Sequence, residues 1–350
     1  MNPNSSLSAD ELRHVSGSLK RAHMSDHLAT AVFYVVSGAF VLLLIAFTMY
    51  VVWGGIKAFR PEIFSFEASG IGNQFFNTVY LVFLSLVISV PIGIFAGVYM
   101  AEYAPEGRII HALRIAIETL SSLPSIVVGL FGYLVFIIMV GFQWNLFAGA
   151  LAVSVLSLPL ITATTYDALK ALPHGFKEGS LALGATHFET IWKVMLPAAI
   201  GPIVTGIILA AGRGFGEAAA LLYTAGMSTD ISWQVWDITS PVCPLNPFRP
   251  GETLSLQVLA SRTEGIGGSA ADTAAAASAV LMLMVLSFSI GARLISHYIT
   301  KKTEGEHAYC TIMEIQWRSR LLPIPRPSRS ITISASIARM SICTTALFRP

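Results

Sequence analysis

The sequence predicts an all-α membrane protein with six transmembrane helices. Of its 350 residues, 54% are hydrophobic and only 12% are charged. A soluble globular chain carries about 25% charged residues. The chain also contains charge-poor stretches of the roughly 20 residues that one membrane helix needs. We therefore expect lipid, rather than water, to surround most of the chain.

Five apolar stretches supply the six spans. The third stretch has about twice the length that one span needs, and the sequence at residues 141–145 predicts a turn that divides it. The fifth span is interrupted only by Arg213 and Glu217. The stretches are residues 27–56, 68–101, 119–166, 194–222 and 273–292.

Both ends of the chain differ from the middle. Residues 1–26 are polar, and the apolar stretch after them has spanning length without a small-residue cleavage site, which predicts a retained helix rather than a signal peptide. The chain becomes rich in Ser, Arg and Pro near its end. We therefore expect a cytoplasmic N-terminal segment at 1–26, a transmembrane domain at 27–300 and a disordered cytoplasmic tail at 301–350.

The positions of lysine and arginine predict the orientation, because cytoplasmic loops carry an excess of them. One side of the membrane would hold eleven, in short segments, and the other only four in longer ones. We expect the first side, and both termini, to be cytoplasmic. The first set is Arg13, Lys20, Arg21, Arg108, Arg114, Lys170, Lys177, Lys193, Arg293, Lys301 and Lys302; the second is Lys57, Arg60, Arg249 and Arg262.

Two connections between spans are long. Residues 104–120 carry charges of both signs, which predicts an amphipathic helix lying against the cytoplasmic side. Residues 227–272 are predicted to be external, and their four prolines argue against a regular element. Trp233 and Trp236 suit the aromatic belt at the membrane surface.

Several functional classes find no support. No basic run is long enough or sufficiently interleaved with aromatic residues to indicate nucleic acid as a partner. The three cysteines, Cys243, Cys310 and Cys343, form no C-x-x-C pair and have no histidine cluster near them. The sequence therefore indicates no metal site, disulfide framework or cofactor.

The segment 172–197, between the fourth and fifth spans, has a distinctive spacing. An acidic residue is followed by two small residues, by a glycine six positions after it and finally by Leu-Pro. Such a pattern predicts two short helices at an angle, with small side chains that let a partner surface approach. An ordinary interfacial helix with a glycine hinge is the alternative. The residues are Glu178, Gly179, Ser180, Gly184, Leu196 and Pro197.

This segment resembles the EAA loop of ABC importer permeases. Gly179 and Ser180 stand where two alanines are usual, and Val194 stands for isoleucine, so the residues remain small or apolar. The resemblance implies the type I, MetI-like permease fold. It also implies that residues 172–197, called the coupling segment below, dock into a separate ATPase subunit and transmit its closure to the membrane helices.

Arg213 and Glu217 lie within the fifth span, with Arg213 roughly 20 Å from its cytoplasmic start. A charge at that depth costs several kcal/mol, so it should face the bundle interior or a wet cavity. At i, i+4 spacing the two side chains share a helix face. Two interpretations stay open: a structural salt bridge, or an arginine in the translocation path that offers its guanidinium to a tetrahedral oxyanion.

Residues 30–300 resemble the phosphate-specific permeases of the PstA type. The likeness rests on four blocks, at 118–132, 180–186, 212–217 and 246–254. It implies a second, homologous permease subunit, an ATP-binding subunit dimer, an extracytoplasmic phosphate-binding protein, and phosphate as the substrate. It also implies that Arg213 and Glu217 are tied to transport. Pro124, in the first block, suits either a kink or a gate.

Other functions remain as alternatives. An ABC importer for sulfate, molybdate or an organic anion is the nearest, and a secondary anion transporter is more remote because no inverted repeat is evident. The chain has no G-x-x-x-x-G-K-[ST] motif, so we expect it to rely on a separate ATPase. No Ser-His-Asp set or carboxylate pair lies within the spans, which disfavours an intramembrane enzyme.

Overall fold

The computed structural model describes residues 9–66, 70–105, 107–228, 230–263 and 268–320. Within these residues the chain is helical and has no β-strand. Four helices are long and apolar enough to cross a membrane, or up to six if each of two bent helix pairs is one span. The all-α prediction is confirmed, and the span count reaches six only with the bent pairs.

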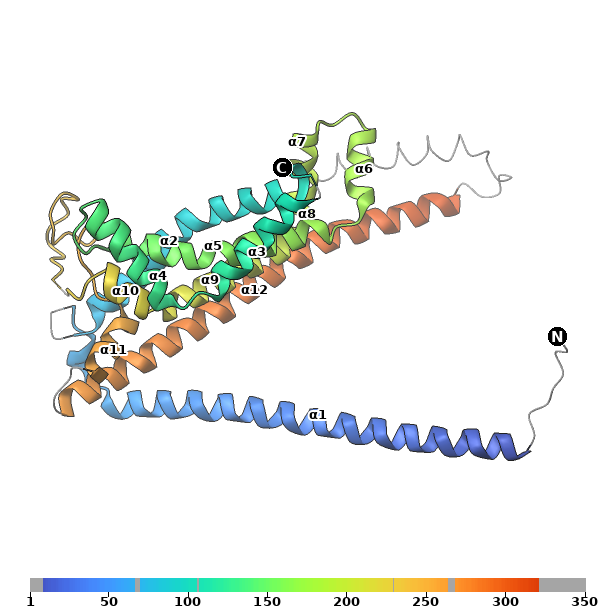
Figure 1. Cartoon of the computed structure of the whole chain (residues 1–350), viewed down its shortest axis with the longest axis horizontal. Coiled ribbons are helices and arrows are strands. Elements are labelled where there is room, and N and C mark those ends of the chain that lie inside the picture. The colour runs from blue at the N-terminus through green and yellow to red at the C-terminus, as the bar shows by residue number, and fades with distance from the viewer. Residues whose placement is uncertain (1–8, 67–69, 106, 229, 264–267, 321–350) are drawn as a thin grey trace.

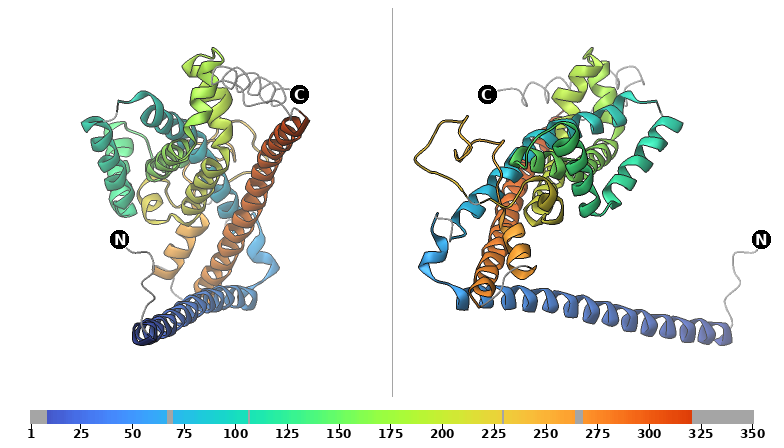
Figure 2. Two further views of the ribbon diagram at one scale, coloured as in Figure 1. Left: turned by 90° about the vertical axis from the view of Figure 1, so that its right-hand side faces the viewer. Right: turned by 60° about the vertical axis from the view of Figure 1, so that its left-hand side comes forward.

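Two long helices meet at one end of the molecule (Figure 1). Helix α1 (Ala9–Ala58) diverges from the remainder of the bundle in every view, while α12 (Gly268–Arg320) runs along it (Figure 2). Gly55 of α1 touches α12 so closely that an added Cβ would clash with the side chain of Ala279. The absence of a side chain therefore sets the approach of the two helices. A 3-10 turn, η1 (Pro61–Phe64), follows α1.

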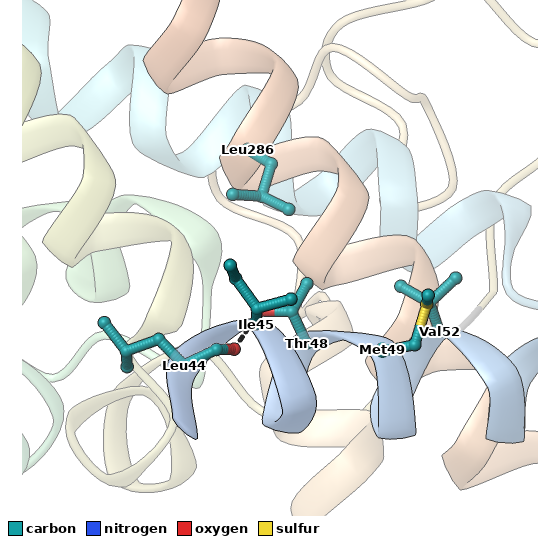
Figure 3. Close-up of a pocket in the computed structure, with 6 residues that line it drawn as sticks. All are labelled: Leu44, Ile45, Thr48, Met49, Val52 and Leu286. Atoms are coloured by element: carbon teal, nitrogen blue, oxygen red, sulfur yellow. Dashed lines mark hydrogen bonds between the residues drawn. The ribbon is translucent and has the colours of Figure 1, made fainter. Parts of the chain in front are cut away.

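An apolar groove of about 370 Å³ lies between α1 and α12 (Figure 3). Its sole hydroxyl belongs to Thr48, which donates a hydrogen bond to the carbonyl of Leu44 in its own helix. No charged side chain lines the groove, so it offers nothing to an anion. The lining residues are Leu44, Ile45, Thr48, Met49, Val52 and Leu286.

Three helices form the centre of the bundle. They are α2 (Gly72–Val98), α5 (Leu146–Lys170) and α9 (Ile200–Gly216), and α5 packs against both of the others. Gly93 and Gly97 of α2 lie directly against Ile161 and Thr165 of α5. Small residues allow such close helix contacts in membranes. A π-helical turn, η2 (Tyr99–Tyr103), continues α2.

The third predicted span begins later than expected. The amphipathic helix is present as α3 (Arg108–Ser122), and it is followed by α4 (Ser125–Gly132) and the π-helical η3 (Tyr133–Met139), bent from α3 by 97°. Residues 119–122 belong to α3, because Pro124 disfavours a helical conformation in the residue before it. The turn predicted near residues 141–145 is confirmed, and Gly141 there has a φ of +80°.

The fifth predicted span is not one continuous helix. It begins with α7 (His187–Thr190), the π-helical η4 (Ile191–Met195) and α8 (Leu196–Ala198), which are bent by 69° from α9. Helix α9 then ends at Gly216, and α10 (Ala219–Thr224) follows after a break. The span predicted at 194–222 therefore contains a bend before α9 and a break after it, neither of which the sequence indicated. The break falls where Glu217 takes an extended conformation with ψ of 123°.

The long connection at 227–272 was predicted to lack a regular element. Its proline-rich part, up to Pro250, consists of turns and loops, but α11 (Leu254–Thr263) follows it, so the prediction was wrong there. The prolines end four residues before this helix begins. Helix α12 also continues through residues 301–320, past the predicted start of the tail, and residues 321–350 lie outside the described part.

Candidate functional site

The coupling segment forms two short helices, as its spacing predicts. Helix α6 (His174–Ala182) and α7 project together at one end of the bundle (Figure 1). Gly184 between them has a φ of +86°, a conformation that costs other residues roughly 1–2 kcal/mol. A Cβ at Gly184 would meet no atom within 4 Å. The backbone conformation, and not a lack of space, therefore favours glycine.

Hydrogen bonds hold the two short helices as one unit. The hydroxyl oxygens of Ser180 in α6 and Thr190 in α7 lie 2.9 Å apart, and both residues are buried. Thr186 and Glu189 form a reciprocal capping box at the start of α7. Such a box satisfies backbone N–H groups that a helix start leaves free. The angle between α6 and α7 is thus defined by contacts within the segment.

Apolar packing fixes the end of the segment to the bundle. Leu196 is buried with Ile191 and Met195 in a cluster that includes Val98 of α2 and Leu169 of α5. Pro197 is exposed, and it stands in the first turn of α8, where its missing N–H leaves no hydrogen bond unmade. Leu196 therefore attaches the segment to the membrane helices rather than facing outward.

The outer surface of the segment is charged and apolar. Glu178 is exposed, and Gly179 beside it is half-buried. Four large apolar side chains are exposed on the same segment: Leu181, Leu183, Phe188 and Trp192. Exposed apolar side chains of this kind suit contact with another protein or with lipid.

Arg213 and Glu217 lie close together, as their spacing predicts. The Nε atom of Arg213 is 3.5 Å from Oε1 of Glu217, and their side chains are 35% and 10% exposed. The carbonyl oxygen of Glu217 accepts a hydrogen bond of 2.5 Å from the hydroxyl of Ser255. The pair therefore lies at the end of α9. The backbone carbonyl of Glu217, just beyond that helix, is hydrogen-bonded by Ser255.

One face of α9 has no close neighbour among the described residues. Pro202, Thr205, Leu209 and Gly216 are exposed, and half-exposed Arg213 lies on the same side. A Cβ at Gly212 or Gly216 would meet nothing within 4 Å, whereas Gly214 packs against Val82 and Val153. Of the three glycines around Arg213, only Gly214 therefore serves packing within this chain.

Sequence reasoning missed a buried polar cluster between α2 and the external loop. Arg249, counted above as a charge on the external surface, is completely buried. Its Nη2 donates to Oδ1 of Asn77 at 2.6 Å and to the carbonyl of Pro244 at 3.1 Å. Burial lowers the pKa of Arg249 to about 10, so the guanidinium stays charged at neutral pH. The loop is thereby bound to the N-terminal part of α2.

Glu252 belongs to the same cluster and is 4% exposed. Nε2 of Gln74 lies 3.3 Å from its Oε2, and the side-chain amide of Gln257 turns its nitrogen toward the same carboxyl group. Burial raises the pKa of Glu252 to about 7. The sequence of the loop gave no signal for this arrangement, because Gln74 lies in α2, far away in the sequence.

No metal centre emerges from the described residues, among which no three His, Cys, Asp or Glu side chains come together. Cys243 is buried and makes no disulfide. Cys343 lies outside the described residues, and the side chain of Cys310 is likewise not described.

Comparison with known proteins agrees with this architecture. A family model described as "Binding-protein-dependent transport system inner membrane component" matches residues 89–304. The "Probable ABC transporter permease protein YqgI" of Bacillus subtilis is 40% identical over 286 residues, which cover 80% of this chain and 97% of the relative. The "Phosphate transport system permease protein PstA" of Xylella fastidiosa (strain 9a5c) is 34% identical over 233 residues, which cover 65% and 75%.

A solved structure shares the fold. It is the crystal structure of a bacterial ABC transporter involved in the import of the acidic polysaccharide alginate, with a TM-score of 0.56 and 16% identity, over 81% of this chain and 100% of that chain. The predicted permease fold is therefore confirmed. The chain belongs to the family of binding-protein-dependent transport system inner membrane components, and is a multi-pass permease of the ABC importer type.

Proposed function

We propose that this chain is one permease subunit of an ATP-driven importer of inorganic phosphate. The observation that carries the proposal is the half-exposed Arg213 on the unpartnered face of α9, held by Glu217. A guanidinium at that place can bind two oxygens of a tetrahedral oxyanion. Relatives that are 32–34% identical bear the name phosphate transport system permease protein, which supports phosphate over other anions.

The translocation path forms against a second, homologous permease. The exposed face of α9 supplies one wall, and the partner covers it so that Arg213 faces a water-filled path rather than lipid. This arrangement satisfies the rule that an intramembrane charge faces a bundle interior or a wet cavity. Glu217 keeps the Arg213 guanidinium in position between transport cycles. When the anion passes, it replaces Glu217 as the partner of the guanidinium.

The coupling segment receives an ATP-binding subunit on the cytoplasmic side. Glu178 and Gly179 lie on α6 and allow close approach, Ser180 holds α6 to α7 through Thr190, and Gly184 sets the angle to α7. The exposed apolar side chains of the segment enter a cleft of the ATPase. Leu196 and Pro197 join the segment to the membrane helices. An extracytoplasmic phosphate-binding protein delivers the substrate at the opposite face, and both termini are cytoplasmic.

Uptake of radiolabelled phosphate by cells or vesicles that contain the complete complex tests the proposal. We expect uptake that requires both the ATPase and the binding protein, and copurification of the ATPase with this chain. Uptake that survives loss of the ATPase would instead favour a secondary carrier. Uptake of sulfate or molybdate with no phosphate uptake would assign the same machinery to another anion.

A further inference from the structure

A single carboxylate contacts both helices of the coupling segment. Oε2 of Glu102, in η2 at the end of α2, lies 2.6 Å from Nζ of Lys177 in α6 and 3.5 Å from Nε2 of His187 in α7. The Glu102 side chain is only 6% exposed. We call these three residues the Glu102 tether.

The Glu102 tether also sets which side of α6 faces outward. Successive residues on an α-helix point about 100° apart, so a Lys177 that turns toward Glu102 leaves the next residue, Glu178, facing solvent. The ring of Tyr103 meets His187 edge-on at 5.1 Å, which gives α7 a second contact with η2. The tether and the Tyr103–His187 contact therefore join both short helices to the end of α2.

The segment responds to the tether as one body, because Ser180 and Thr190 connect α6 to α7. A short, charge-assisted hydrogen bond to a nearly buried carboxylate is stronger than an exposed ion pair. The Lys177 side chain is 37% exposed, so the carboxylate is the more buried partner of the pair. The contact is thus suited to transmit force between the segment and α2.

The N-terminal end of α2, opposite the Glu102 tether, lies in the buried polar cluster that contains Arg249 and Glu252. Asn77 binds Arg249, and Gln74 binds Glu252, in the loop before α11. A rigid helix with specific contacts at both ends can carry a displacement from one membrane surface to the other. Ser255, in the first turn of α11 that follows this loop, donates a hydrogen bond to the carbonyl of Glu217 at the break after α9.

We propose that Glu102 is a positioning residue that transmits movement of the coupling segment to α2 and, through it, to the external loop. This inference rests on the proposed docking of an ATPase to the segment. When the ATPase displaces α6 and α7, Lys177 and His187 carry Glu102 and η2 with them. Without the carboxylate the ATPase still binds, but its movement reaches the membrane helices poorly.

Glu102→Gln in the assembled complex tests this inference. We expect unchanged copurification of the ATPase and basal ATP hydrolysis within roughly twofold of wild type. Stimulation of hydrolysis by the phosphate-loaded binding protein, and phosphate uptake, should both fall about tenfold, within the range of typical coupling between sites. The charge-exchanged double variant Glu102→Lys, Lys177→Glu should recover much of both.

Asp272→Asn is the matched control. It removes a carboxylate from an exposed pair with Arg60, at 3.4 Å, that joins the start of η1 to α12. It should leave uptake and stimulation at wild-type levels. Three outcomes would overturn the proposed role of the tether. They are normal uptake by Glu102→Gln, loss of the ATPase from that variant, and no recovery in the charge-exchanged variant. A wild-type complex that never binds the ATPase would instead contradict the proposed function.

Discussion

The Arg213 guanidinium and the Glu217 carboxylate meet at the point where α9 stops, with Nε and Oε1 separated by 3.5 Å. Glu217 is no longer helical, and its carbonyl accepts a hydrogen bond from Ser255 in the first turn of α11. Glu217, the partner of the proposed substrate residue, is therefore held in place by α11.

We expect Arg213→Gln to abolish phosphate uptake while the complex still assembles. The substitution retains hydrogen-bond donors but removes the charge and the fork that binds two oxygens. Thr205→Val, on the same exposed face of α9, is the control and should keep most of the uptake, because its hydroxyl is satisfied by the carbonyl of Gly201 in its own helix. Radiolabelled uptake and copurification measure both. Normal uptake by Arg213→Gln would leave the arginine a packing role only.

Glu178→Lys should weaken binding of the ATPase by reversing an exposed charge on α6. We expect a severalfold loss of copurified ATPase and a parallel loss of uptake, since electrostatic complementarity contributes to such interfaces. Glu118→Lys, an equal charge reversal on the exposed surface of α3, should change neither. Equal behaviour of the two variants would remove the special role of the coupling segment.

Gly184→Ala should disturb the coupling segment through its backbone. The alanine would have to adopt a φ near +86°, at a cost of roughly 1–2 kcal/mol, or shift the angle between α6 and α7. Gly175→Ala, in α6 with open space around it, should be tolerated or slightly stabilising. ATPase copurification and uptake at 37 °C compare the two. If Gly184→Ala and Gly175→Ala gave equal copurification and uptake, a glycine in the left-handed conformation at position 184 would not be required.

Glu252 should make stability depend on pH. Because its folded-state pKa is raised from 4.5 to about 7, its stabilising contribution is complete at acid pH and is lost as pH rises through 7. We expect the thermal midpoint of the wild type, measured in detergent, to fall between about pH 5 and pH 8, corresponding to about 2 kcal/mol.

Two variants check that assignment. Glu252→Gln keeps the shape and cannot ionise, so its thermal midpoint should change much less over the same range. Glu62→Gln removes an exposed carboxyl group in η1, and should retain the wild-type dependence. A wild-type pH profile that persists in Glu252→Gln would assign the dependence to another group.

Accessibility labelling tests the orientation. After replacement of the native cysteines by serine, a cysteine at exposed Leu181 of the coupling segment should react with an impermeant thiol reagent only in opened cells. A cysteine at exposed Leu245, in the external loop, should react in intact spheroplasts. The reverse pattern would place the coupling segment where no cytoplasmic ATPase can reach it.

The sequence alone determined the membrane environment, the all-α class, the approximate spans and the form of the coupling segment. These features depend on local properties: the length of apolar stretches, the placement of charges, and a spacing of Glu178 and Gly184 within a single loop. The turn near residues 141–145 followed from local signals in the same way, and the family match agrees with the permease assignment.

Only the tertiary structure decided where helices break and which charges are buried. The end of α9 depends on Ser255, 38 residues later, and the burial of Arg249 depends on Asn77, 172 residues earlier. The contact of Glu102 with Lys177 spans 75 residues. Periodicity and composition describe one segment at a time. Two residues that come into contact only through folding therefore leave no pattern in the sequence of either segment.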